Sequence, residues 1–203
     1  MRTTMLLTVP LAAISMALVS VRAVAATGEP PIVAHVCADC HGRQGNSSDP
    51  GVPSLAGQGR DYLQKQLIAF RLQQRLGVMS GIALGLDDTD IDQAATYFSQ
   101  QIPRWSPTGS SAVPSDHGRT IYNDGIAENQ VPACASCHAL DGSGLLPSFP
   151  RLAGQHAPYL AGQLRAFRSD SRLSNPDATM RKVAATLSDH DIQAVADYIA
   201  AMH

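Results

Sequence analysis

The cysteines of the chain form two pairs with the same spacing, and a histidine directly follows each pair. The two segments read Cys37-Ala38-Asp39-Cys40-His41 and Cys134-Ala135-Ser136-Cys137-His138. Cysteines three residues apart face the same way over one helical turn, so both thiols of a pair can add to the vinyl groups of one haem. The adjacent histidine can then bind the iron as its proximal ligand. Each segment therefore predicts one covalently attached haem c.

Three other kinds of cysteine chemistry fit these segments less well. A thioredoxin-like redox pair needs a βαβ pattern, which the sequence lacks around both pairs. A zinc site would have to bring together two pairs that lie 97 residues apart. A disulfide between cysteines three apart on a helical turn has poor geometry. We therefore expect two haem c groups, with iron as the metal.

The two segments belong to a repeat that covers most of the chain. At an offset of 97 residues, Pro53-Ser54-Leu55-Ala56-Gly57-Gln58 matches Pro150-Arg151-Leu152-Ala153-Gly154-Gln155. Further along the chain the offset becomes 101, and there Met79 and Tyr97 match Met180 and Tyr198. Internal repetition of this kind predicts two copies of one domain.

The repeat also selects candidates for the second axial ligand of each iron. After removal of the leader, the methionines that remain are Met79, Met180 and Met202. A single methionine is usually a core filler, but Met79 and Met180 occupy equivalent positions of the repeat. We expect these two to bind iron, which would raise the reduction potential and close the iron to substrates. None of the other histidines recurs in the repeat, and we expect surface or packing roles for them: His35, His117, His156 and His190.

Pro53 and Pro150 are candidates for a supporting role at the histidines. A ligating histidine usually donates its second ring N–H to a fixed acceptor, and a backbone carbonyl in a rigid proline turn would suit. A role in stiffening the loop explains the prolines equally well. Spacing alone leaves both interpretations open.

The N-terminus resembles a secretory signal. Arg2 precedes a mostly apolar stretch from Met5 to Val21, and Ala23-Val24-Ala25 forms a cleavage site of small residues. A retained membrane anchor is the competing interpretation, although the stretch is marginal for spanning a bilayer. We expect cleavage near residue 25 and a periplasmic protein. The rest of the chain carries a formal charge of about −4 before any haem propionates, which argues against nucleic acid as a partner.

The remaining sequence predicts helices and no strands. Apolar residues recur at helical spacing over 61–76, 89–101, 158–168 and 188–202, and Ser188 with Asp191 resembles a capping box. Proline, glycine and serine concentrate in 103–116, which predicts a linker in which Trp105 packs onto one domain. The expected division is a signal peptide (1–25), a first domain (26–102), a linker (103–116) and a second domain (117–203).

Taken together, the two Cys-x-x-Cys-His motifs, the paired Pro-x-Leu-Ala-Gly-Gln loops and the paired Met-x-x-x-Ala-x-x-Leu segments resemble the cytochrome c4 family. The resemblance implies an all-α protein of two tandem class I cytochrome c domains, each wrapped around one covalent haem. It implies thioether bonds at the four cysteines, proximal ligation by His41 and His138, and distal ligation by Met79 and Met180. It also favours Pro53 and Pro150 as carbonyl acceptors for the histidines.

The first domain departs from the pattern before its cysteines. The second domain has a helix pattern around Gly118, Ile121 and Tyr122, whereas the first has only a short segment containing Pro30-Pro31. We expect its leading helix to be very short or missing, and its haem site to be looser and more exposed.

The function expected from these features is the shuttling of single electrons in the periplasm, not catalysis on a substrate. The expected partners are redox proteins: a membrane donor complex, a terminal oxidase or a periplasmic dehydrogenase, with possible association at the membrane surface. An alternative is an electron-accepting subunit of a dehydrogenase complex, such as a flavocytochrome sulfide dehydrogenase. A haem enzyme, such as a peroxidase or a thiosulfate-oxidising cytochrome, would need an open or differently ligated iron, against which the matched methionines argue.

Overall fold

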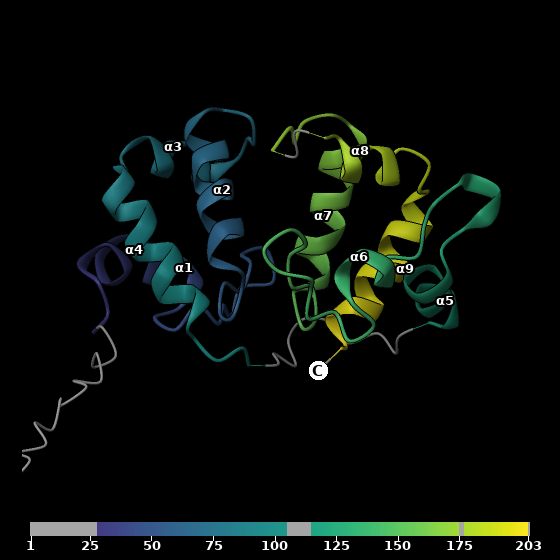
Figure 1. The fold of residues 1–203 in the computed structure, drawn as a ribbon, viewed down its shortest axis with the longest axis horizontal. Coiled ribbons are helices and arrows are strands. Elements are labelled where there is room, and N and C mark those ends of the chain that lie inside the picture. The colour runs from purple at the N-terminus through teal and green to yellow at the C-terminus, as the bar shows by residue number, and fades with distance from the viewer. Residues whose placement is uncertain (1–27, 105–114, 175–176, 203) are drawn as a thin grey trace, which may run out of the picture.

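The computed structural model describes residues 28–104, 115–174 and 177–202. The predicted cleavage site and Trp105 lie outside these residues. Within them the regular structure is helical, and the only β-type pairing consists of isolated bridges. The prediction of an all-α protein is therefore confirmed. Figure 1 shows that the helices form two groups side by side, one from each half of the chain.

The element order is the same in both groups, apart from one additional helix in the second. The first group contains η1 (Val33–Cys37), α1 (Ala38–His41), α2 (Arg60–Arg71), α3 (Val78–Leu84) and α4 (Asp88–Ser99). The second group contains α5 (Asp116–Asp124), η2 (Ala127–Asn129), α6 (Ala135–His138), α7 (Ala157–Arg168), α8 (Thr179–Ala184) and α9 (Asp189–Ala200). The additional helix is α5, which precedes the second cysteine pair.

The last helix of each domain begins with a capping box. Ser188 accepts a hydrogen bond from the Asp191 backbone N–H, and the Asp191 carboxylate accepts one from the Ser188 N–H. This confirms the capping box expected at α9. Helix α4 uses Asp87 and Asp90 in the same way, and it begins one residue before the predicted start at 89. Both caps satisfy backbone donors that the first helical turn would otherwise leave unpaired.

The predicted helix over 61–76 is wrong at its C-terminal end. Helix α2 ends at Arg71, and Gln73 adopts a positive φ of 58° that a helix cannot continue. The chain turns there, and Arg75 forms an isolated antiparallel bridge with Arg172 of the other domain. Local backbone hydrogen bonds close this turn, from the N–H groups of Gln73 to the Phe70 carbonyl and of Gln74 to the Ala69 carbonyl.

In the second domain, α5 crosses α9 at very short range. A Cβ on Gly118 would lie 2.1 Å from the Ala194 carbonyl oxygen, so only glycine permits this approach. Ile121 and Tyr122 of α5 are buried against Ile192 and Val195 in the largest core cluster. The predicted contact of the leading helix with the end of the chain is present, because Tyr122 also contacts Tyr198 with ring centroids 5.6 Å apart.

The first domain lacks such a crossing among the described residues. Its first element is the π-helical turn η1, from which the fully buried Val33 packs against Ala94, Ala95 and Phe98 of α4. Gln93, the counterpart of Ala194 at the offset of 101, is exposed. The expectation that the leading helix of this domain is very short is therefore confirmed.

The two domains meet along α2 and α7, which face each other near the centre of Figure 1. The Gln58 side chain donates to the Arg151 carbonyl oxygen and accepts from the Arg151 N–H, each at 2.9 Å. Gln155 makes the same pair of bonds to the backbone of Ser54, at 2.8 and 2.9 Å. We call these four bonds the glutamine clasp. Its symmetry follows from the repeat, since Gln58 and Gln155 are equivalent residues.

Candidate haem sites

One-turn helices carry the second cysteine and the histidine of each motif, and the first cysteine directly precedes them: Cys37 ends η1, and Cys134 is the N-cap of α6. Helix α1 ends at His41 and α6 ends at His138, and the chain reverses after each, with a positive φ at Gly42 and Ala139. All four cysteines are unpaired thiols. The structure therefore presents, twice, two thiols on one helical turn with a histidine directly behind them.

The two histidines are held in the same way by a backbone carbonyl. His41 Nδ1 lies 2.8 Å from the Pro53 oxygen, and His138 Nδ1 lies 2.9 Å from the Pro150 oxygen. A carbonyl oxygen can only accept, so Nδ1 carries the proton and Nε2 keeps its lone pair. Each histidine is 6% exposed. The contact expected for the two prolines is thus present in both domains.

Burial favours the neutral form of both imidazoles. It lowers the pKa of His41 and of His138, while the hydrogen bonds to the Pro53 and Pro150 carbonyls act in the opposite direction and are the smaller effect. A neutral imidazole with a free Nε2 is the form that binds iron. The chemistry of these donors therefore fits a haem whose iron is bound by the histidine.

The loop after each histidine places the proline. In the first domain the Gly45 carbonyl oxygen accepts hydrogen bonds from the N–H groups of Leu55 and Ala56, at 2.6 and 3.0 Å. In the second domain Gly142 accepts from the equivalent residues, Leu152 and Ala153, at 2.8 and 3.0 Å. These bonds fold the loops back so that the proline carbonyls meet the histidines.

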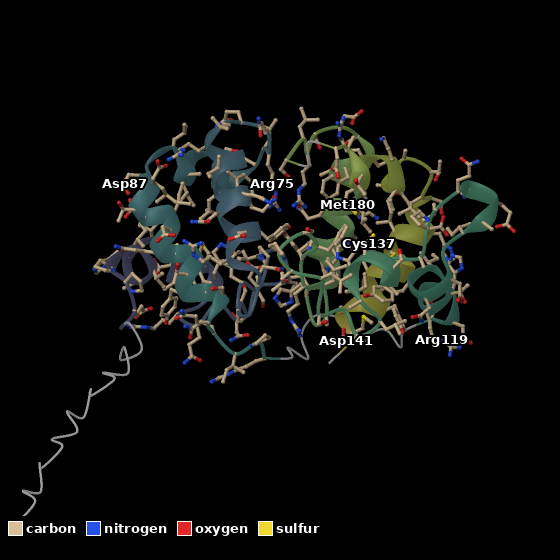
Figure 2. All side chains as sticks on the ribbon, viewed as in Figure 1. Arg75, Asp87, Arg119, Cys137, Asp141 and Met180 are labelled. Atoms are coloured by element: carbon tan, nitrogen blue, oxygen red, sulfur yellow. The ribbon has the colours of Figure 1, made fainter. Side chains whose placement is uncertain are left out.

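Met79 and Met180 lie on short helices that pack against the long helix of each domain. Met79 is the second residue of α3, which contacts α2, and Met180 is the second residue of α8, which contacts α7. Both are half-buried. In the view of Figure 2, Met180 lies above Cys137 within the second domain. Ligation of iron by these methionines stays a prediction.

Comparison with known proteins agrees with this architecture. A family model described as Cytochrome c matches residues 115–203, and one described as Cytochrome C oxidase, cbb3-type, subunit III matches residues 24–98. Cytochrome c4 of Azotobacter vinelandii is 39% identical over 184 residues, which cover 84% of this chain and 86% of that protein. The chain belongs to the cytochrome c4 family.

Two further comparisons extend this assignment. Reduced recombinant cytochrome c4 from Pseudomonas stutzeri has a similar crystal structure, with a TM-score of 0.75 and 38% identity over 84% of this chain and 95% of that chain. A thiosulfate dehydrogenase electron acceptor from Stutzerimonas stutzeri (strain A1501) is 37% identical over 94% of this chain and 93% of its own length. The protein thus has two cytochrome c domains with two covalent haem c groups.

The alternative uses of the cysteines do not fit this member of the family. Before haem attachment, burial raises the pKa of the Cys37 and Cys134 thiols to about 11, so neither of these two is a reactive thiolate. Among the described residues no disulfide forms, and the four cysteines do not gather into a metal cluster. They lie in separate domains, as thioether attachment to two haems requires.

The expectation of a more exposed first haem site is wrong at the histidine, because His41 and His138 are equally buried. A difference is found at the second cysteine of each motif, since Cys40 is exposed and Cys137 is half-buried. Val33 of the η1 turn packs in the core of the first domain, whereas the Cys40 side chain is exposed.

His156 has a role that sequence reasoning did not identify. It is 1% exposed, and its Nε2 lies 3.1 Å from the Ser47 carbonyl oxygen in the other domain. The packing role expected for His156 is present, but it lies at the domain interface. The only sequence signal was its place directly after Gln155 of the glutamine clasp.

Proposed function

We propose that this protein is a periplasmic dihaem electron carrier in which both irons are closed by histidine and methionine. His41 and Met79 would bind the iron of the first haem, and His138 and Met180 that of the second. The haem supplies the Fe(III)/Fe(II) couple. The protein attaches the haem, holds each histidine in one tautomer and keeps water and substrates from the iron.

The observation that carries this proposal is the matched pair of histidine–proline contacts. Each buried imidazole is neutral and fixed by a carbonyl, and each domain places a methionine on the equivalent helix. Two similar closed irons suit single-electron exchange. A haem enzyme would instead need one open iron, whereas the two histidines share the same burial and the same proline contact.

The natural partners of such a carrier are a membrane donor complex and an acceptor such as a terminal oxidase. Redox encounters of this kind are brief and bury little surface. In the described residues no helix is long and apolar enough to cross a membrane. The carrier would work in the periplasm and meet the membrane through its partners.

A second candidate function is that of an electron acceptor for thiosulfate dehydrogenase. It is favoured by the relative from Stutzerimonas stutzeri, whose match covers nearly the whole chain. The two functions differ in the donor and not in the chemistry at the haems. The dehydrogenase partner expected from the sequence would then oxidise thiosulfate instead of sulfide.

Stopped-flow reduction separates these two functions. The oxidised protein is mixed with thiosulfate and catalytic amounts of purified thiosulfate dehydrogenase, or with reduced membranes, and haem reduction is followed by absorbance. Fast reduction by membranes and slow reduction by the dehydrogenase supports the respiratory shuttle. The opposite order supports the thiosulfate pathway. Failure of both donors to reduce the haems would contradict the carrier function itself.

A further inference from the structure

Outside the haem motifs, the second domain brings together three side chains that can bind a metal ion. They are His117 from α5, and His190 and Asp191 from α9. One ligand atom of each residue lies within 4.8 Å of those of the other two. We call these residues the histidine–aspartate cluster. Two imidazoles and one carboxylate form a ligand set that suits divalent transition metals such as zinc.

The cluster lies where two helices begin close to each other. His117 is the second residue of α5 and directly precedes Gly118, at which α5 closely approaches the Ala194 carbonyl of α9. His190 and Asp191 are the second and third residues of α9. The helix crossing therefore fixes the backbone that carries all three side chains.

The capping box of α9 holds the carboxylate of Asp191 in one orientation. Its Oδ2 accepts hydrogen bonds from the Ser188 N–H at 2.9 Å and from the Ser188 hydroxyl at 2.6 Å. Its Oδ1 lies 2.7 Å from His117 Nε2. Asp191 is only 9% exposed. Hydrogen bonds of this kind orient a carboxylate for a metal ion, so Oδ1 is a prepared ligand.

The two histidines are exposed and can adjust to an ion. Their rings stack with centroids 4.9 Å apart and planes inclined by 23°. Two ligands of a tetrahedral zinc ion lie roughly 3.3–3.6 Å apart, since the bonds are about 2.0–2.2 Å long. The separation of 2.7 Å between His117 Nε2 and Asp191 Oδ1 is shorter than this. A small rotation of the exposed His117 side chain is enough to admit the ion.

The repeat shows that the cluster is particular to the second domain. At the offset of 101 residues, Asp90 matches Asp191, but Thr89 stands where the second domain has His190. Among the described residues the first domain also has no counterpart of α5. Capping of the last helix explains the aspartate in both domains. It does not explain the two histidines.

We propose that the histidine–aspartate cluster is a zinc site that joins α5 to α9. Three protein ligands leave one position of a tetrahedral ion for water. Figure 1 shows α5 at the end of the molecule away from the first domain, so the ion lies outside the domain interface. Zinc binding here does not involve the haem irons. Its failure would therefore leave the proposed electron transfer standing.

The ion favours the folded second domain. His117 and Asp191 lie 74 residues apart in the chain, so the unfolded chain does not hold the ligands together. A ligand that binds the folded state in preference to the unfolded state raises stability in proportion to the logarithm of its concentration. The site thus acts as a cross-link between the first and last helices of the domain.

The test is equilibrium dialysis of the untagged holoprotein against Zn(II), after treatment with a chelator, at about pH 7.5, above the reference pKa of imidazole. Elemental analysis then counts zinc against the iron of the two haems. In the holoprotein the cysteines are attached to haem and cannot bind the ion. We expect saturation at one zinc per two irons. Binding that does not saturate, or no binding, would overturn the proposal.

His117→Ala and His190→Ala test the ligands. Loss of a hydrogen bond that merely supports a ligand weakens metal affinity by about 10–100-fold, so loss of a ligand should weaken it at least about tenfold. Both side chains are exposed, so the variants should fold. Asp191 is left unchanged because its replacement also removes the capping box.

His35→Ala is the matched control, since His35 is also an exposed histidine but lies in η1 of the first domain. It should bind zinc as wild type does. If all three variants bind zinc equally, the ion does not bind at the cluster. His117 and Asp191 then form an ion pair only, and the proposal fails.

Denaturant unfolding with and without zinc gives a second readout. Zinc should raise the unfolding midpoint of wild type and of His35→Ala, and leave that of His117→Ala unchanged. Magnesium at the same concentration should have no effect, because it prefers oxygen ligands to imidazole. Equal shifts with both ions, or an equal zinc shift in His117→Ala, would contradict a site at the cluster.

Discussion

At the residue scale, the fixed tautomer of each histidine is the feature that links structure to function. The carbonyl oxygens of Pro53 and Pro150 accept from Nδ1, which leaves Nε2 as the metal-binding atom. The same contact stops the imidazole from rotating. Ligands that are held in place reduce the structural reorganisation around the iron when it changes between Fe(II) and Fe(III). The two contacts differ by 0.1 Å, so we expect similar chemistry at both irons.

Met79→Ala and Met180→Ala test the proposed second ligand of each iron separately. Either change should remove about half of the sulfur-to-iron charge-transfer absorption of the oxidised protein and lower the potential of one haem, since the thioether favours Fe(II). Visible spectra and redox titration measure both. Met202→Ala serves as control and should leave both unchanged. Full retention of the absorption in either of the first two variants would exclude that methionine as a ligand.

Asp191 should make the stability of the second domain depend on acid pH. Burial would raise its pKa, but hydrogen bonds from Ser188 and the contact with His117 outweigh burial and lower it. A lowered pKa gives stability that is present above the unfolded value of about 3.9 and is lost as pH falls below it. Asp191→Asn should cost about 1 kcal/mol at neutral pH. Denaturant unfolding should also show a weaker loss of stability for this variant between about pH 5 and 3.

Most of these residues were identifiable from the sequence. The cysteines, histidines and methionines follow from motif and repeat, and the resemblance added the role of the prolines that spacing left open. Arg75 and His156 were not identifiable as interface residues. Their partners lie more than 80 residues away in the chain, and local patterns carry no information about such contacts.

At the scale of elements, the two domains cover their last helix in different ways. The second covers α9 with α5, which approaches closely at Gly118. The first covers α4 with Val33 from the short η1 turn. The sequence predicted this difference, because the segment between the expected cleavage site and Cys37 is too short for a full helix. The end of α2 was not predictable, because the turn has a positive φ at Gln73, a residue type that does not signal the end of a helix.

Gly118→Ala should destabilise the second domain selectively. Its new Cβ would overlap the Ala194 carbonyl and force α5 away from α9, at a cost of about 1–3 kcal/mol. Gly162→Ala is the control, because Gly162 lies exposed in α7 with open space around its Cβ position. It should gain about 0.5–1 kcal/mol through better helix propensity. Equal stability of the two variants in denaturant titrations would show that the crossing tolerates a methyl group.

At the scale of the whole molecule, the two repeated domains meet at an interface with approximate two-fold symmetry. The glutamine clasp and the hydrogen bonds of Arg75 and Arg172 each use equivalent residues from the two domains. Such an interface fixes the relative placement of the two haems. The division into two domains was predictable from the repeat, but the contacts that join them were visible only in the structure.

Replacing both glutamines of the clasp should loosen the interface. Gln58→Ala with Gln155→Ala removes four hydrogen bonds to the backbone of the opposite domain, which should weaken domain association by about 2–6 kcal/mol at roughly 0.5–1.5 kcal/mol per bond. Small-angle scattering should show a larger radius of gyration, and electron exchange between the haems should slow. Gln193→Ala is the control, since Gln193 is exposed on α9 and donates to Asp197 of the same helix. An unchanged radius in the double variant would mean that the clasp does not hold the domains together.

The most direct test of the whole account is a redox titration of the full holoprotein with carbon monoxide as a probe of open iron. Two covalent haems with closed irons predict two electrons taken up per chain and a reduced spectrum that carbon monoxide does not change. Uptake of a single electron, or formation of a carbon monoxide complex at either haem, would contradict the account.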